Sequence, residues 1–348
     1  MDATPTLNTR RLLKAASSRW LGKGRRSALA LNLHEVAHAV PRLDPQALLR
    51  VVRLFLAEAS SDDCFEFCEG MRRRALDSQS SVDHVLQVYA TLARALSEAG
   101  VDLSGRRLLE LGPGHSMLGG LLLLSWGLGE YHGVDALPVA HWDAGRVQAL
   151  RARLESASGL PLHEVPLAKR QREVLARFDR AVTLRAGEAV LNEDLIRLHC
   201  PVDAADLPLE SNSFDLVVSN SVLEHVRDLP ATAAECARVL APGGVAFHQV
   251  DFRDHRDFSQ PRAFLRVASQ EWEELWTDRP FQYTNRHRLS AVRSAFSAAG
   301  LELLELKINE RLPLGEEERQ LLRPSFQTCS QEDLETLGAS LLLRKGSA

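Results

Sequence analysis

The sequence predicts an α/β protein with a doubly wound, mostly parallel seven-stranded sheet. An antiparallel C-terminal edge strand completes the sheet, and an α-helical N-terminal region precedes it. Three observations predict this class. Apolar residues recur with helical spacing up to about residue 100, and short apolar runs then alternate with helical stretches. The last two runs are separated by too little helix for a parallel crossover.

The N-terminal region carries recognisable helix ends. Asp44 can cap a helix with Pro45 in its first position, which is a common arrangement at helix starts. Asp83 can cap a second helix, which Gly100 ends. We therefore expect residues 31–100 to be mainly helical.

Seven short apolar runs are candidates for the strands. Their length and their β-branched or leucine-rich composition are typical of strands that are buried on both faces. They occupy residues 107–112, 131–136, 195–200, 214–220, 244–252, 301–308 and 338–345.

Composition divides the 348 residues into a basic arm (1–30), the helical region (31–100) and a sheet domain (101–348) with a helical insertion (138–194). The net charge of −4 indicates no nucleic-acid partner. The five scattered cysteines indicate reduced thiols and a cytoplasmic location. No apolar run is long enough to span a bilayer.

The first 30 residues carry seven basic side chains against one acid, a local balance of +6. This segment could be a surface arm, a weakly membrane-contacting helix or a transit peptide. A solvated terminus is the simplest interpretation.

Residues His34, Glu35 and His38 fit H-E-x-x-H, the pattern of a zinc metallopeptidase, and Glu58 could supply a third ligand. Pro41 ends that helix almost at once, and the preceding 30 residues offer no strand to hold a peptide substrate. We therefore expect no metal, and a zinc peptidase remains only an alternative.

The stretch "LLELGPGHSMLGG" (108–120) indicates a ligand site. Gly112 and Gly114 make a tight turn between a strand and a helix, which lets a ligand approach the backbone closely. Asp135 ends the next strand, 21 residues beyond Gly114, where a carboxylate can bind ribose hydroxyls. Met117 stands where a dinucleotide-binding turn needs a third glycine. The turn thus favours a ligand with a ribose but without a pyrophosphate.

At this point the chain resembles the class I S-adenosylmethionine-dependent methyltransferases of the methyltransferase type 11 group, over about residues 105–255. Four motifs carry the resemblance in order: "LLELGPG", "GVDA", "VDAADLPLESNSFDLVVSNSVLEHV" and "RVLAPGG". Ser116, where the group has a third small glycine, is a departure. The resemblance implies a Rossmann-like fold and S-adenosyl-L-methionine as cofactor.

It also implies which residues bind that cofactor. These are Glu110, Gly112, Pro113 and Gly114 at the methionine portion, Asp135 and Ala136 at the ribose, Asp203 and Ala204 at the adenine, and Asn220 after the fourth strand.

The acceptor side is suggested by "FHQVDFRDHRDF" at the exit of the fifth strand. We predict His255 as the catalytic base, with Asp254 or Asp251 available to orient its ring, because imidazole titrates near neutral pH. His225, His248, Tyr283 and Arg286 are predicted substrate residues, the last two from a stretch that mixes guanidinium groups with aromatic rings.

The chain lacks the Asn/Asp-Pro-Pro-Tyr signature of enzymes that methylate amide or adenine nitrogens. It looks loosely like methyltransferases of bacterial surface-saccharide assembly. We therefore expect O-methylation of a small-molecule or saccharide acceptor. A non-catalytic partner protein that retains S-adenosylmethionine is the alternative from a different class.

Overall fold

The computed structural model describes residues 78–114, 117–136, 143–156, 167–185, 188–276 and 283–347. The basic arm, the H-E-x-x-H segment and most of the predicted helical region lie outside these residues. The predicted division of the chain into domains therefore stays a prediction.

Within the described residues, seven strands form one sheet in the order β5-β2-β1-β6-β7-β9-β8. The strands are β1 (Arg107–Leu111), β2 (Glu130–Val134), β5 (Ile196–His199), β6 (Phe214–Asn220), β7 (Leu240–Asp251), β8 (Leu301–Arg311) and β9 (Thr336–Lys345). Each matches a predicted run to within a few residues.

The pairing confirms the predicted class. Strands β5, β2, β1, β6 and β7 pair in parallel, and β9 is antiparallel to both of its neighbours. The antiparallel strand lies between β7 and β8, so β8 forms the outer edge. The burial of the two strands explains this order, because β9 carries a continuous buried run through Leu341, Leu342 and Leu343. Strand β8, by contrast, has exposed charged side chains between its apolar ones.

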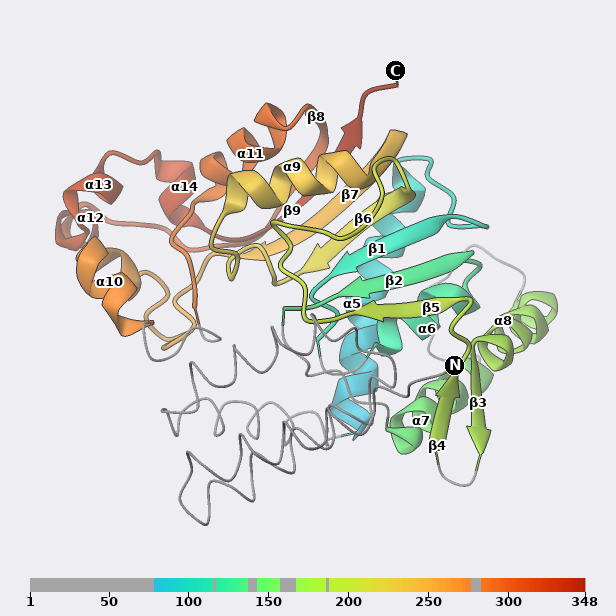
Figure 1. Cartoon of the computed structure of the whole chain (residues 1–348). Helices are drawn as coiled ribbons and strands as arrows, with labels where there is room; N and C mark the ends of the chain where they lie inside the picture. The colour runs from blue at the N-terminus through green and yellow to red at the C-terminus, as the bar shows by residue number, and fades with distance from the viewer. Residues whose placement is uncertain are drawn as a thin grey trace, which may run out of the picture. The chain divides into compact units, whose positions relative to one another are not determined.

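Helices cover both faces of the sheet (Figure 1). One face carries α5 (Ser78–Glu98), α6 (Leu118–Ser125), α7 (Ala144–Glu155) and α8 (Leu167–Ala181), which share one apolar core. The other face carries α9 (Leu229–Val239) and α11 (Leu289–Ala298), which share a second core.

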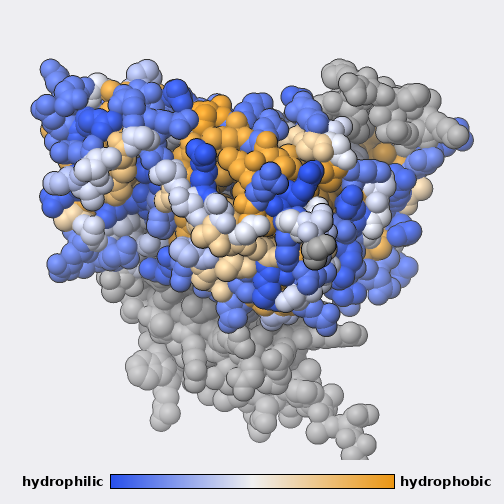
Figure 2. Space-filling model, turned by 90° about the horizontal axis from the view of Figure 1, so that it is seen from above, coloured by the Kyte–Doolittle hydropathy of each residue, from blue (hydrophilic) through white to orange (hydrophobic). Residues whose placement is uncertain are grey.

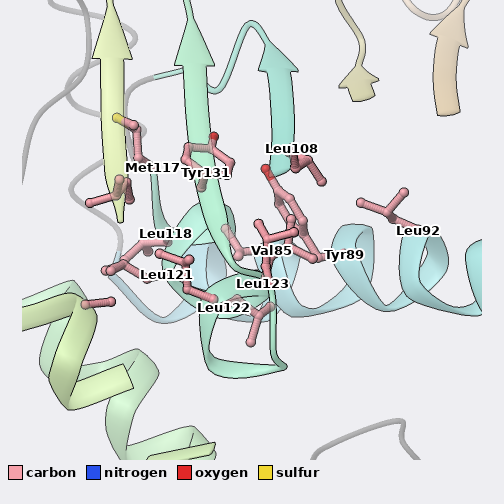
Figure 3. Packing of buried hydrophobic residues seen from close by; sticks show 14 of the residues in the cluster. Val85, Tyr89, Leu92, Leu108, Met117, Leu118, Leu121, Leu122, Leu123 and Tyr131 are labelled. Carbon is pink, nitrogen blue, oxygen red and sulfur yellow. The ribbon is translucent and has the colours of Figure 1, made fainter. Parts of the chain in front are cut away.

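Buried side chains of α5 pack on α6 and on β1 (Figure 3). This packing holds β1, and with it the start of the turn that follows, in position. Every residue of α6 is buried, because the helix is enclosed by the sheet, α5 and α8. Gly119 faces the ring of Tyr89, and Gly120 faces the ring of Tyr131. A side chain at either glycine would meet an aromatic ring, so these two small residues let α6 pack closely on α5 and on β2.

The insertion between β2 and β5 contains more than the predicted helices. Helices α7 and α8 are followed by an antiparallel hairpin of β3 (Val182–Arg185) and β4 (Glu188–Leu191). Each of these strands has only four residues, which is too few for their periodicity to predict the hairpin.

A third apolar cluster lies beside the sheet, in the segments that follow β7 and β8 in sequence. It is built from η2 (Ala263–Arg266), α10 (Ser269–Leu275), α12 (Glu316–Leu321), α13 (Pro324–Gln327) and α14 (Gln331–Glu335). Arg262 is buried within it and donates to Glu318 and to the carbonyls of Leu312 and Pro313. A buried arginine with this many acceptors ties the small helices together.

No helix among the described residues is both long and apolar enough to cross a membrane. Seen from above, hydrophilic side chains surround an apolar area on the surface (Figure 2). Apolar atoms commonly contribute more than half of the surface of a folded protein, so this area by itself assigns no partner.

The contact between α5 and α6 yields a stability prediction. Alanine favours a helix over glycine by about 1 kcal/mol. A Cβ at Gly119, however, would lie 1.9 Å from the Tyr89 ring. Since overpacking of a core costs about 1–3 kcal/mol, we expect Gly119→Ala to lower the free energy of unfolding, measured by denaturant titration.

Gly315→Ala is the matched control, because a Cβ there meets nothing within 4 Å. We expect it to change stability by less than about 0.5 kcal/mol. A stabilised Gly119→Ala protein would show that the close packing of α5 on α6 is wrong.

Candidate active site

The carboxyl ends of the parallel strands meet at one edge of the sheet, and the turn after β1 begins the site. Gly112 has φ +63°, and a Cβ on it would lie 2.5 Å from Val222 Cγ2. Gly114 has φ +71°, and a Cβ on it would meet no other atom of the described residues within 4 Å. Packing therefore requires glycine at 112, whereas Gly114 borders open space where a ligand can approach the backbone.

Asp135 lies next to this turn. The Gly114 N–H donates to Asp135 Oδ2 at 3.3 Å, and the Gly112 N–H donates to the Val134 carbonyl at 2.7 Å. The two bonds join the β1 turn to the end of β2. Asp135 is half-buried and Ala136 is exposed, so the carboxylate stands at the rim of the open space.

The loop after β5 lies against the same edge. The Val202 N–H donates to the Asp135 carbonyl at 2.9 Å. The Asp203 side chain accepts from the Ala205 N–H at 2.9 Å, which closes a local turn, and Ala204 is half-buried. The structure thus brings the predicted ribose and adenine residues onto adjacent loops.

Glu110 points away from the open space. Its buried carboxylate accepts hydrogen bonds from the hydroxyls of Tyr89 and Tyr131, one from α5 and one from β2. Burial raises the pKa of Glu110 to about 7, against the opposing effect of the two hydroxyl donors. Its predicted contact with a methionine portion stays a prediction.

His225 lies in the loop that follows β6 and Asn220. Its Nδ1 is 2.8 Å from the carbonyl oxygen of Tyr283. A carbonyl only accepts, so Nδ1 carries the proton and a neutral ring keeps its lone pair on Nε2. The ring meets His255 edge to face, with the ring centroids 5.0 Å apart. The two histidines, predicted from separate motifs, therefore lie together.

Asp251, rather than Asp254, is the acidic partner of His255. The Asp251 Oδ2 atom lies 3.6 Å from His255 Nε2. The chain turns after β7, so residues four apart approach each other there. Burial opposes the charge of Asp251, but His255 and Arg253 outweigh it and lower the pKa of this carboxyl.

The prediction that Asp254 supports His255 was wrong. Asp254 is buried, and its carboxylate accepts from the backbone N–H and the guanidinium of Arg256. The turn that follows β7 aims this side chain back into its own loop.

His248 lies in the core of the sheet and not at the loop ends of the strands. It is fully buried in β7, where Nδ1 is 2.8 Å from Ser219 Oγ and the ring stacks on Phe296 of α11. Burial lowers the pKa of His248 to about 3. The predicted substrate role is corrected, because this side chain faces the core with Ala246 and Val250.

Of the two remaining substrate predictions, Tyr283 lies at the site and Arg286 does not. Tyr283 holds His225 through its carbonyl, and the Arg227 guanidinium lies 4.2 Å from its ring centroid. Arg286 donates to the carbonyls of Val267 and Phe264 and lies over Trp272. Its donors are used to hold the third cluster together.

Glu224, which precedes His225, was not predicted as a site residue. It is 3 % exposed, and its Oε1 accepts from the Asp251 N–H at 3.3 Å. Oε2 has no hydrogen-bond partner within the described part of the chain. Burial raises the pKa of Glu224 to about 8. Its position in the otherwise apolar run "SVLEHV" was the available signal.

Asn285 was also missed, and it holds this loop in place. Its side-chain amide donates to the carbonyls of Leu223 and Val226, and its N–H donates to the Glu224 carbonyl. Three bonds from one residue fix the backbone on both sides of Glu224 and His225.

A doubly wound sheet, a glycine turn after its first strand and an acid that ends the second are the features expected of a class I S-adenosylmethionine-dependent methyltransferase. The family model described as a methyltransferase domain matches residues 83–306, so the chain belongs to this family. The chain is therefore an S-adenosylmethionine-dependent methyltransferase with S-adenosyl-L-methionine as its cofactor, which confirms the predicted class.

Individual relatives match shorter stretches. The malonyl-[acyl-carrier protein] O-methyltransferase of Geobacter sulfurreducens is 34 % identical over 116 residues, which are 33 % of this chain and 42 % of that protein. The ubiquinone biosynthesis O-methyltransferase of Psychrobacter cryohalolentis is 38 % identical over 66 residues, which are 19 % of this chain and 25 % of that protein. The matches thus span less than half the length of these relatives.

Among solved structures, an S-adenosylmethionine-dependent methyltransferase from Mesorhizobium loti aligns with a TM-score of 0.39 and 14 % identity. That alignment covers 72 % of this chain and 96 % of the other.

The buried carboxylate of Glu110 yields a pH prediction. Its pKa is about 7 in the folded chain, against an ordinary value of 4.5. The folded chain therefore keeps this proton to a higher pH than the unfolded chain does. The free energy of unfolding should fall as pH rises between these values, by on the order of 3 kcal/mol from this group.

We expect Glu110→Gln to reduce that fall, as measured by denaturant unfolding between about pH 5 and pH 8. Glu302→Gln, which removes an exposed carboxylate on β8, is the control and should keep the wild-type slope. An unchanged slope in Glu110→Gln would contradict the assigned pKa.

Proposed function

We propose that the chain is an O-methyltransferase that acts on a small-molecule or saccharide acceptor. The observation that carries this proposal is the imidazole pair of His225 and His255, with Asp251 beside it, at the ends of β6 and β7. The two relatives described above are both O-methyltransferases, which supports oxygen as the acceptor atom.

The cofactor half of the site is proposed to lie over β1, β2 and β5. The open space at Gly114 fits a ligand close to the backbone, and Asp135 offers a carboxylate to ribose hydroxyls. Gly112, Pro113 and Asn220 would border the methionine portion. Ala136 would lie by the ribose, and Asp203 and Ala204 by the adenine.

The acceptor half is proposed to lie over the β6 and β7 loops. Bound S-adenosylmethionine supplies a methyl group made electrophilic by its sulfonium. In the transfer, a lone pair of the acceptor oxygen forms the new C–O bond, and the S–C bond electrons pass to sulfur. The hydroxyl proton leaves at the same time and is taken up at the His225–His255 cluster. General-base assistance of this kind contributes about 10²–10⁴ in rate.

Cofactor affinity should depend on Asp135. Asp135→Ala removes an acceptor for two ribose hydroxyls and the partner of the Gly114 N–H. Hydrogen bonds to a charged group contribute about 1.5–3 kcal/mol, so S-adenosylhomocysteine should bind at least about tenfold more weakly by calorimetry.

Asp194→Ala is the control, because it removes the same charge from an exposed turn before β5. Equal affinity in a folded Asp135→Ala protein and in this control would overturn the ribose assignment.

Turnover should depend on His255. With methyl-labelled S-adenosylmethionine and a panel of phenol, alcohol and saccharide acceptors, we expect label on oxygen, located by mass spectrometry and NMR. His255→Ala should lower kcat by at least about 100-fold and leave S-adenosylhomocysteine affinity within about twofold.

His84→Ala, an exposed histidine of α5, should keep the wild-type kcat. Label on nitrogen or carbon would refute O-methylation. Normal turnover by His255→Ala would remove the imidazole pair from the reaction.

A further inference from the structure

Three potential metal ligands converge where the β6 and β7 loops meet. Ligand atoms of Glu224, His225 and His255 all lie within 4.8 Å of one another. Glu224 and His225 come from the loop after β6, and His255 comes from the loop after β7. The sequence led us to expect no metal, because Pro41 ends the H-E-x-x-H segment, the zinc pattern that was weighed.

Two of these side chains present polar atoms that no hydrogen bond satisfies. Glu224 Oε2 and His255 Nε2 are both buried and have no hydrogen-bond partner among the described residues. Leaving such a group unsatisfied costs about 1–3 kcal/mol, and more for a charged group. A cation between them would satisfy both atoms at once.

The surroundings orient the ligands. The Tyr283 carbonyl accepts from His225 Nδ1–H, which is the common outer contact of a metal-binding imidazole. Asn285 fixes the backbone on either side of Glu224 and His225. Both supports come from one segment that folds back from beyond α10.

Asp251 stands beside this cluster. Its Oδ2 lies 3.6 Å from His255 Nε2, and both of its carboxylate oxygens accept from the Arg253 guanidinium. Its negative charge close to the cluster favours a cation there.

We infer that Glu224, His225 and His255 form a binding site for a divalent transition-metal ion of the Zn²⁺ class. Two imidazoles with a carboxylate suit Zn²⁺, Fe²⁺ or Ni²⁺, whereas Mg²⁺ and Ca²⁺ prefer oxygen ligands alone. The inference rests on the proposed function for its use: a cation beside the acceptor hydroxyl would lower the pKa of that hydroxyl. With the metal bound, its ion would hold the imidazole lone pairs, and the hydroxyl proton would pass to solvent; without it, the imidazole pair takes the proton.

The test is calorimetric titration of the chelator-stripped full chain with Zn²⁺ alone. We expect one site that Mg²⁺ does not fill. Glu224→Gln and His255→Ala should each weaken its Kd by at least about tenfold. Both variants should keep the wild-type affinity for S-adenosylhomocysteine, which shows that they fold, and His84→Ala should bind Zn²⁺ as the wild type does. Co²⁺ in the same site should give visible absorption bands that His255→Ala loses.

His34→Ala combined with His38→Ala separates this site from the H-E-x-x-H segment. The double variant should retain the site. Zinc binding that is lost in the double variant and kept in Glu224→Gln would overturn the inference, as would a stripped wild-type chain that binds no Zn²⁺.

The outcome is independent of the acceptor chemistry. A chain that binds Zn²⁺ here but methylates nitrogen keeps this inference and refutes the proposed function. A chain that methylates oxygen at full rate but binds no Zn²⁺ keeps the proposed function and refutes this inference.

Discussion

The buried carboxylate of Glu110 is the interaction on which the rest of the site depends. Glu110 is the last residue but one of β1. Its carboxylate accepts hydrogen bonds from the hydroxyls of Tyr89 in α5 and Tyr131 in β2. One side chain thus joins a helix and two strands directly beneath the glycine turn. A carboxylate in this position is costly to bury, and the two hydroxyl donors reduce that cost. The turn above it is therefore held in place from below before any ligand contacts it.

The strands could be predicted because each is a short apolar run between turn residues, and the cofactor loops could be predicted because glycine and acid spacing follow from the fold. The acceptor side could not be predicted to the same degree. Asp254 and Asp251 were both candidates to orient the His255 ring, and only the turn after β7 decides that Asp251 lies beside it. His248 shares the buried face of β7 with Ala246 and Val250, and a period-two reading of that strand would have excluded it.

Arginine and aromatic residues near the C-terminus have a structural use that their composition does not reveal. Arg262 donates hydrogen bonds to a carbonyl and to Glu318, and Arg286 donates to a carbonyl, all within the third cluster. Guanidinium groups can serve either role, and only the acceptors around them decide which. The same segment then supplies Tyr283 and Asn285, whose backbone and amide contacts fix the His225 loop. The third cluster therefore holds the His225 loop in place, on the side where the acceptor is proposed to bind.

The two halves of the site are also coupled through a steric contact at Gly112. A Cβ there would lie 2.5 Å from Val222, whose carbonyl accepts from the His225 N–H at 2.8 Å. The glycine that shapes the turn over β1 therefore also sets the position of the loop that carries Glu224 and His225. A larger residue at 112 would have to displace Val222, and the imidazole pair with it. Methyl transfer requires an in-line arrangement of acceptor oxygen, methyl carbon and sulfur, and small displacements reduce its rate steeply. The small size of Gly112 thus sets how close the loop that carries Glu224 and His225 lies to the turn over β1, the proposed places of the acceptor and the cofactor.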